Sequence, residues 1–226
     1  MVKTLNFEEG KLYIAETVKE YTSCIDKGPV VFLELNEKAP ESAAYVIGPD
    51  VLGDMGYLRM VFCHMSKIPY VIAETKRLII RESIPQDAAA FKEIYSGEKG
   101  FFSEGSESLT EEGLEAYIKN MYGFYGFGLY TVVYKETGKV IGRVGFSFED
   151  EAESPEIGFV IDKKYRRAGI AYEAAAAVIK YMRNNLQIDK LSGKCREDNT
   201  ASLRLLRRLD EEFGIEIKTL KEEGKV

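Results

Sequence analysis

The feature that most limits how this chain can fold is a buried strand joined to a long alanine-rich helix by a short basic turn. The strand spans residues 156–161, the helix spans residues 171–184, and Arg166, Arg167 and Gly169 stand between them. Free N–H groups and the helix dipole attract anions to the start of a helix, and glycine lets a phosphate approach the backbone closely. The segment therefore predicts a phosphate-binding turn, although a solvated basic turn before a core helix fits the same pattern.

The spacing of this segment excludes the two common phosphate motifs. The sequence has no G-x-x-x-x-G-K-[ST], which excludes a P-loop, and no G-x-G-x-x-G after the strand, which excludes a dinucleotide fingerprint. What remains is the pattern R-x-x-G-x-A, formed by Arg166, Gly169 and Ala171.

Residues 75–226 carry further short apolar runs and helical patterns separated by turn residues. We expect strands at residues 75–82, 129–135, 140–148, 190–195 and 215–220, and helices at residues 88–95, 114–121 and 199–209. Asp87 is the expected N-cap of the helix at residues 88–95. Residues 136–139 carry a hairpin signal between two of the strands.

The first 74 residues predict a small α/β module of their own. We expect helices at residues 8–21 and 53–67, and strands at residues 29–35, 44–48 and 69–74. Helices that alternate with short apolar strands favour parallel pairing. About 70 residues bury only a marginal core, so we expect the module to depend on the rest of the chain for stability. The expected domains are residues 1–74 and residues 75–226.

The motif and its surroundings resemble the acetyl-CoA signature of the GNAT N-acetyltransferase superfamily, closest to the branch of ribosomal-protein-alanine and polyamine acetyltransferases. The other landmarks of this family lie in order at residues 77–81, 140–145 and 199–202. The resemblance covers about residues 75–226. It implies an α/β (α+β) fold with a GNAT-like mixed, mostly antiparallel central sheet flanked by helices, preceded by the small N-terminal module.

The resemblance also implies which residues hold acetyl-CoA. Backbone groups of Phe159, Val160 and Ile161 would pair with the pantetheine amides, in a notch where the fourth and fifth strands of the family splay apart. The pyrophosphate would be held by the Arg166 side chain and by the backbone N–H groups of Arg167, Ala168, Gly169, Ile170, Ala171 and Tyr172. Asn199 would reach the pantetheine arm, and Ser202 would touch that arm or a phosphate.

Acetyl transfer to an amine needs a neutral amine, stabilisation of the oxyanion and a proton for the departing thiolate. A backbone N–H near Val160 or Ile161 would serve the oxyanion. Glu156 or Glu149 is the expected base, directly or through a water, unless the acidic run at residues 149–156 only faces solvent.

The proton donor departs from the pattern of many relatives, because Leu206 stands where a tyrosine is common. Solvent, Tyr172 or Tyr165 would have to replace that tyrosine. The aromatic and glycine residues at 122–128 form either a lip of the acceptor pocket or tight turns packed on the core.

Charge is distributed unevenly along the chain. The net charge of −6 argues against a nucleic-acid partner and against an anionic membrane surface. Residues 98–162 carry a net charge of −8 and residues 163–208 a net charge of +8. The positive part suits a cofactor with phosphates and the negative part suits cationic amines, unless both are merely solvated faces.

The cysteines and the single histidine suggest neither a metal site nor a thiol nucleophile. Cys24, Cys63 and Cys195 are odd in number and lack C-x-x-C spacing, so we expect buried free thiols. His64 comes directly after Cys63, and chain neighbours point in different directions. No stretch reaches about 20 apolar residues and no signal core is present, so we expect a cytoplasmic protein.

Taken with these patterns, the resemblance implies an acetyl-CoA-dependent N-acetyltransferase that transfers the acetyl group directly from the thioester to a primary amine, on a small molecule or a protein N-terminus. No metal is expected. The alternative is a non-catalytic protein that binds or senses acyl-CoA and uses residues 1–74 for partner contacts. A homodimer through sheet-edge pairing is compatible with either function.

Overall fold

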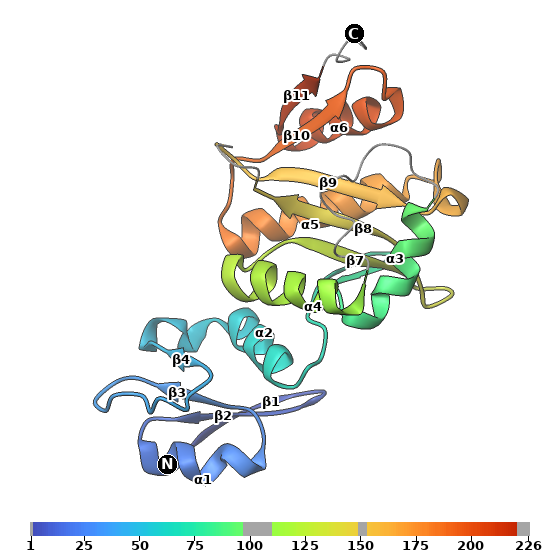
Figure 1. Ribbon diagram of the computed structural model, residues 1–226. Helices are drawn as coiled ribbons and strands as arrows, with labels where there is room; N and C mark the ends of the chain where they lie inside the picture. Colours follow the sequence, from blue (N-terminus) through green and yellow to red (C-terminus); the bar gives the residue numbers. More distant parts are fainter. Residues whose placement is uncertain (1, 97–109, 149–152, 221–226) are drawn as a thin grey trace. The chain divides into compact units, whose positions relative to one another are not determined.

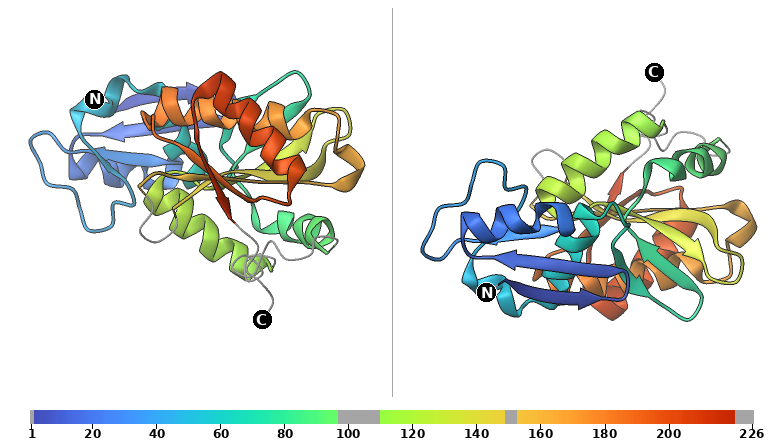
Figure 2. Two further views of the ribbon diagram at one scale, coloured as in Figure 1. Left: turned by 90° about the horizontal axis from the view of Figure 1, so that it is seen from above. Right: turned by 90° about the horizontal axis from the view of Figure 1, so that it is seen from below.

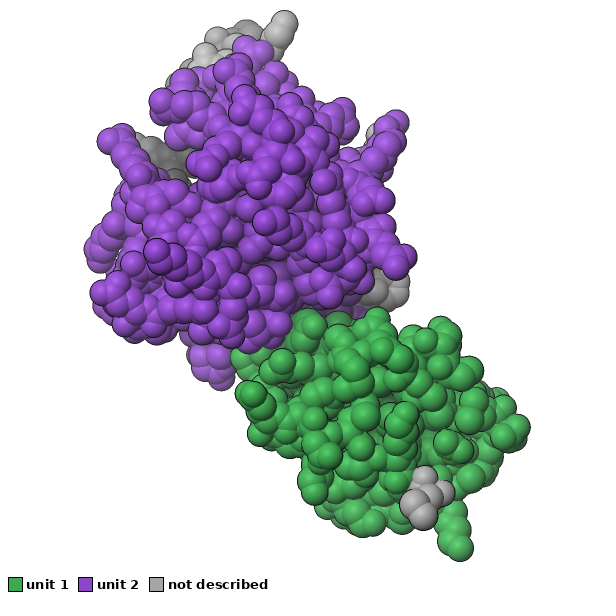
Figure 3. Space-filling model, turned by 180° about the vertical axis from the view of Figure 1, so that it is seen from behind, with its two compact units in different colours: residues 1–70 green, residues 71–226 purple. Residues whose placement is uncertain are grey.

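The chain divides into two compact units, Met1–Tyr70 and Val71–Val226, each built around its own sheet (Figures 1 and 3). The computed structural model describes residues 2–96, 110–148 and 153–220.

Unit 1 holds a four-stranded sheet in the order β1-β2-β3-β4. The strands are β1 (Lys3–Phe7), β2 (Gly10–Ala15), β3 (Val30–Leu33) and β4 (Val46–Ile47). The helices are α1 (Val18–Cys24), α2 (Met55–Met65) and the 3-10 turns Ile25–Lys27 and Pro49–Gly53. The predicted parallel pairing is found for β2, β3 and β4, whereas β1 and β2 form an antiparallel hairpin.

The predicted helix at residues 8–21 is wrong, because most of this segment forms the hairpin and β2. Leu12 and Ile14 are fully buried and lie two residues apart, which is the spacing of one face of a strand. The helix begins only at Val18, after the side chain of Thr17 caps it by accepting a hydrogen bond from the Glu20 N–H. The local cap, rather than the apolar spacing, sets the start of α1.

Unit 2 holds a seven-stranded sheet in the order β11-β10-β9-β8-β7-β6-β5. Its strands are β5 (Val71–Glu74), β6 (Leu78–Arg81), β7 (Leu129–Tyr134), β8 (Lys139–Ser147), β9 (Glu156–Ile161), β10 (Ser192–Arg196) and β11 (Glu216–Leu220). Pairing is antiparallel from β5 to β9 and parallel from β9 to β11, which confirms the mixed, mostly antiparallel sheet. The strand expected at residues 69–74 of the first module lies in this second sheet, because β5 pairs with β6.

Helices cover both faces of the second sheet (Figure 2). One face carries α3 (Ala88–Tyr95) and α4 (Glu111–Asn120), and the other carries α5 (Ile170–Leu186) and α6 (Thr200–Phe213). Shorter turns are the 3-10 segments Pro85–Asp87 and Lys163–Tyr165 and the π-helical segment Met121–Tyr125. Within the described residues, no helix is both long enough and apolar enough to cross a membrane.

Asp87 precedes α3 as expected, but its carboxylate does not cap that helix. It accepts hydrogen bonds from the Ile84 N–H at 3.0 Å and from the Thr131 hydroxyl at 2.8 Å, and it pairs with Arg81 at 2.7 and 2.8 Å. The prediction of Asp87 as the N-cap residue is therefore confirmed, but its carboxylate is bonded to Arg81 and to the buried Thr131 hydroxyl instead of the first turn of α3.

Candidate active site

The site is a notch in the second sheet where β9 and β10 separate. Their pairing is limited to Glu156 with Ser192 and Ile157 with Gly193. From Gly158 onward, β9 pairs with β8 alone in the described sheet. One edge of this part of β9 is therefore open, which is the splayed geometry that the family resemblance implied.

A cavity of about 530 Å³ opens at this notch. It is lined by residues from the end of β9, the turn before α5, the start of α5 and the start of α6, namely Phe159, Val160, Ile161, Arg166, Arg167, Gly169, Ile170, Ala171, Tyr172, Asn199, Ala201, Ser202, Arg204 and Leu205. The structure thus brings together around one cavity all the residues predicted to bind the cofactor except Ala168.

Three lining residues were not predicted from the sequence: Ala201, Arg204 and Leu205. They lie within one turn of Ser202 on α6, so the 3.6-residue helical period applied to Ser202 was the available signal. Arg204 adds a positive charge to the cavity wall.

The turn before α5 leaves the start of this helix open to a ligand. Gly169 is the N-cap residue, with a φ of +75°, and no described side chain caps the helix there. Arg167 also has a positive φ, +61°, which is uncommon for a residue other than glycine and typical of functional turns. First-turn N–H groups without a side-chain cap and the helix dipole together make an anion-binding position.

Arg166 fixes this turn to the end of β9. Its Nε donates a hydrogen bond to the Ile161 carbonyl at 2.6 Å. This carbonyl therefore has a donor within the chain, which limits the part that the Ile161 backbone can play toward a pantetheine amide.

Asn199 and Ser202 are joined by the cap of α6. The Asn199 side-chain oxygen accepts a hydrogen bond from the Ser202 N–H at 3.1 Å. The Asn199 oxygen is therefore engaged in the cap, and its amide NH2 is the group suited to donate into the cavity.

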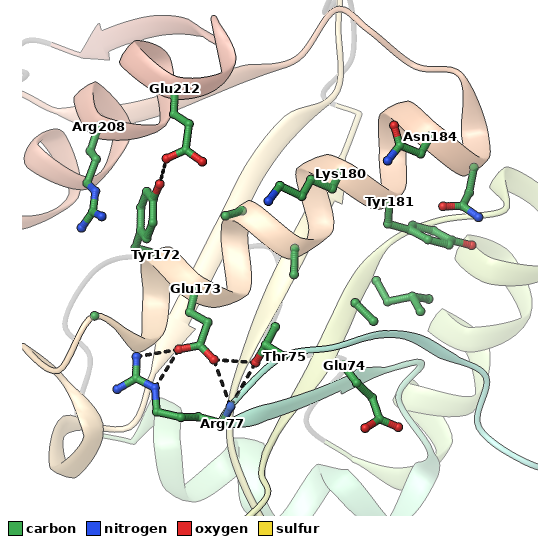
Figure 4. A pocket seen from close by; sticks show the side chains of 16 residues that line it. Glu74, Thr75, Arg77, Tyr172, Glu173, Lys180, Tyr181, Asn184, Arg208 and Glu212 are labelled. Atoms are coloured by element: carbon green, nitrogen blue, oxygen red, sulfur yellow. Dashed lines mark hydrogen bonds and ion pairs between the residues drawn. The ribbon is translucent and has the colours of Figure 1, made fainter.

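Arg77 and Glu173 support the turn that precedes α5 (Figure 4). Arg77 donates through Nη1 to the Ala168 carbonyl at 2.8 Å and through Nε to the Glu173 carboxylate at 2.7 Å. The Thr75 hydroxyl donates to the same carboxylate at 2.5 Å. Ala168 is thus a supporting residue, and neither Arg77 nor Glu173 was predicted as part of the site.

The Glu173 carboxylate stays ionised within this network. Burial acts to raise its pKa, but the hydrogen bonds from Thr75 and Arg77 outweigh burial and hold the pKa below its ordinary value. Arg77 and Glu173 lie 96 residues apart in sequence, so spacing alone could not pair them.

A second cavity of about 710 Å³ lies between β5 and α5 (Figure 4). It shares Gly169 and Tyr172 with the notch cavity. The Tyr172 hydroxyl donates to the Glu212 carboxylate, and the Arg208 guanidinium lies 3.6 Å from the centre of the Tyr172 ring. The wall between the two cavities is therefore held by contacts between α5 and α6.

The structure describes some of the candidate catalytic residues and not others. Glu156 is half-buried at the first position of β9, between Ser147 and Ser192, where the notch begins. Glu149 lies outside the described residues. Leu206 is fully buried and packs against Gly193 of β10, so this position offers no proton donor.

The two tyrosines named as replacement donors have aromatic or ionic partners. The Tyr172 hydroxyl is engaged by Glu212, and the Tyr165 ring contacts the Tyr134 ring at 5.2 Å between ring centres.

The cysteine prediction is confirmed, because Cys24, Cys63 and Cys195 are free and buried. The His64 Nδ1 lies 3.3 Å from the Tyr45 hydroxyl in unit 1. Within residues 2–96, 110–148 and 153–220, no three His, Cys, Asp or Glu side chains gather so that they could hold a metal ion.

Comparison with known proteins gives the same fold. Residues 77–211 match the family model described as the acetyltransferase (GNAT) domain. A structure of the ribosomal-protein-S5-alanine acetyltransferase from Vibrio fischeri is similar with a TM-score of 0.51 and 19% identity, over 63% of this chain and 81% of that chain. A putative GnaT-family acetyltransferase from Bordetella pertussis is similar with a TM-score of 0.51 and 20% identity, over 61% and 86% of the respective chains.

Curated relatives match a similar share of the chain. The chain is 30% identical over 149 residues to the uncharacterized N-acetyltransferase YjdG of Bacillus subtilis, covering 62% of this chain and 88% of the relative. It is 27% identical over 164 residues to the ribosomal protein uS5-alanine N-acetyltransferase of Escherichia coli, covering 66% and 82%. With a family model that spans residues 77–211 and a splayed sheet of the expected topology, the chain belongs to the GNAT acetyltransferase family.

Proposed function

We propose that unit 2 is an acetyl-CoA-dependent N-acetyltransferase that transfers the acetyl group directly from the thioester to a primary amine. The observation that carries this proposal is the notch cavity, which joins an open strand edge at β9 to an uncapped helix start at α5. An extended amide-bearing arm and a pyrophosphate need those two features side by side.

The donors around the cavity fit acetyl-CoA. The first-turn N–H groups of α5 and the charges of Arg167 and Arg204 suit the phosphates, while Arg166 holds the turn in place. The open edge of β9 and the Asn199 amide suit the pantetheine arm. The cofactor, when bound, supplies an activated acetyl thioester, and no metal is required for the transfer.

The chain's own groups account for the remaining steps. An N–H near Val160 or Ile161 is a preorganised donor for negative charge that develops at the notch. Glu156 accepts the proton of the incoming amine, directly or through a water. Solvent is the proposed proton donor, because Leu206 is apolar and the Tyr172 hydroxyl is bonded to Glu212.

The acceptor is a small primary amine or a protein N-terminus. The relative from Escherichia coli is named for an alanine of ribosomal protein uS5, which supports an N-terminal acceptor. We place the protein in the cytoplasm, with no nucleic-acid partner, and propose a homodimer through the sheet edges.

A panel of amines and N-terminal peptides, incubated with acetyl-CoA, tests this proposal by following the release of free thiol. We expect release with at least one acceptor. The second candidate function, a non-catalytic acyl-CoA binder, is favoured by the apolar Leu206 in place of a side-chain acid. Tight acetyl-CoA binding without release for any acceptor would establish the binder instead.

A further inference from the structure

Arg143 is a buried cation on β8, the strand that pairs with β9. It lies near the middle of β8, is 3% exposed, and is paired in register with Thr131 of β7 and Val160 of β9. Its guanidinium lies 4.7 Å from the ring centre of Phe91 on α3 and 4.8 Å from that of Tyr117 on α4. A permanently charged side chain is therefore enclosed between the sheet and these two helices.

The charge of Arg143 has no counter-charge among the described residues. Its Nε and Nη2 have no hydrogen-bond partner there, and the guanidinium is hydrogen-bonded to the Tyr95 phenol. Burial raises the pKa of Tyr95 and of Tyr117, so both phenols are neutral near pH 7. Contacts with aromatic faces offset part of the cost of burying a cation, but they leave its N–H donors unsatisfied.

Arg81 shows that this face of the sheet can supply a carboxylate. It lies in the same cross-strand row, because Thr131 pairs with Arg81 on one side and with Arg143 on the other. Both Nη atoms of Arg81 bind Asp87, at 2.7 and 2.8 Å. The partly buried Arg81 thus has a carboxylate in the fold, whereas the buried Arg143 has none among the described residues.

The two unsatisfied nitrogens of Arg143 form one edge of its guanidinium. Nε and Nη2 point their N–H groups to the same side, which is the edge that binds a carboxylate through two parallel hydrogen bonds. We propose that Arg143 binds a carboxylate of the acyl acceptor, so that the acceptors are amines that also carry an acidic group. This proposal rests on the acetyltransferase function and names its substrate class.

The spacing along β9 narrows that class further. Glu156 and Val160 lie four residues apart on one face of the strand, or about 13 Å along the backbone. The amine and the carboxylate of such an acceptor can therefore lie on different residues of a peptide. A peptide N-terminus with an acidic side chain in its first few residues fits this spacing.

The test compares pairs of hexapeptides with free N-termini. The two peptides of a pair differ only in whether Asp or Asn stands at one of positions two to four. Rates of thiol release are measured for the full chain and for its Arg143→Met and Arg143→Lys variants. We expect the natural protein to prefer an Asp peptide by about tenfold or more in kcat/KM, as for a hydrogen bond to a charged group. Arg143→Met removes the preference, and Arg143→Lys retains part of it.

Thermal unfolding separates binding from a structural role. Replacing a buried unpaired cation by an apolar chain of similar length leaves Tm unchanged or raises it. The matched control is Arg81→Met, which leaves the Asp87 carboxylate without its cation. We expect this variant to lower Tm and to keep the preference for Asp peptides.

Equal rates for Asp and Asn peptides with the natural protein would overturn the proposal while leaving the acetyltransferase function intact. So would a preference that survives Arg143→Met. Absence of thiol release with every acceptor would instead overturn the proposed function, and calorimetric titration of the same peptides would then decide whether Arg143 binds the Asp side chain.

Discussion

At the scale of single residues, the site depends on a few side chains whose partners lie far away in sequence. Arg166 and Gly169 belong to a motif that can be read from the chain, whereas Arg77 and Glu173 support that motif across 96 residues. Local chemistry predicted the groups that line the cavity. The groups that hold the lining in place could not be predicted, because their pairing is set by the approach of β6 to α5.

Glu156 is the residue expected to accept the amine proton. Glu156→Gln keeps the shape and removes the base, so we expect kcat to fall by about 10²-fold or more. The rise of kcat with pH should also move or disappear, which a pH–rate profile measures. Glu153→Gln, in the same acidic run, is the control and should act at the natural rate. A Glu156→Gln enzyme with the natural rate and an unchanged pH–rate profile would show that Glu156 is not the base.

Tyr172 is not expected to protonate the thiolate, because its hydroxyl is bonded to Glu212. Tyr172→Phe should therefore change kcat by less than about threefold, with the aromatic contact to Arg208 retained. Steady-state kinetics check this expectation. A loss of two orders of magnitude in kcat, with unchanged KM for acetyl-CoA, would identify Tyr172 as the acid.

At the scale of elements, the sequence predicted the second unit better than the first. The strands and helices from β6 to β11 show clear apolar periods and turn signals, and they are found close to their expected bounds. In unit 1, the segment Gly10–Ala15 is so short that its apolar positions fit a strand as well as a helix. The assignment of β5 to the second sheet also depends on a tertiary pairing with β6, which no local pattern shows.

The contact between the β5–β6 turn and α5 should depend on pH through Glu173. Its pKa is lowered in the folded protein, so its carboxylate stabilises the fold above its unfolded pKa, and this contribution is lost as pH falls below about 4.3. Glu173→Gln should lower the free energy of unfolding at pH 7, and the difference from the natural protein should shrink toward pH 3. Urea unfolding at several pH values measures this difference.

The control for that experiment is Glu216→Gln, because the Glu216 side chain is 62% exposed on β11. It should leave the free energy of unfolding nearly unchanged at every pH. A Glu173 variant whose difference from the natural protein stays constant with pH would show that the ionised carboxylate does not stabilise the turn.

At the scale of the whole molecule, the modest net charge conceals two opposed regions. Residues 163–208 carry a net charge of +8 and contain the turn, α5 and most of α6 that surround the cavity. Arg204, which a sequence pattern alone would assign to a solvated surface, lines the cavity itself. The positive region therefore coincides with the proposed cofactor site.

This coincidence predicts that salt weakens cofactor binding. Raising the ionic strength from about 0.05 M to 0.5 M shortens the screening length severalfold, so the KM for acetyl-CoA should rise. Arg204→Gln should raise the KM at low salt and reduce its dependence on salt. Arg59→Gln, which removes an arginine that pairs with Glu9 in unit 1, is the control and should behave like the natural protein. A KM for acetyl-CoA that does not change with ionic strength would show that the positive region does not attract the cofactor.

The most direct measurement of the proposed cofactor site is calorimetric titration of acetyl-CoA into the natural protein and two glycine variants. Gly169 and Gly138 both have a positive φ, +75° and +65°, so a side chain strains the backbone at either position. Only Gly169 lines the notch cavity, where glutamate adds bulk and negative charge. We predict that the natural protein and Gly138→Glu bind acetyl-CoA and that Gly169→Glu, although folded, does not. Binding of unchanged affinity by Gly169→Glu would contradict the placement of the cofactor in this notch.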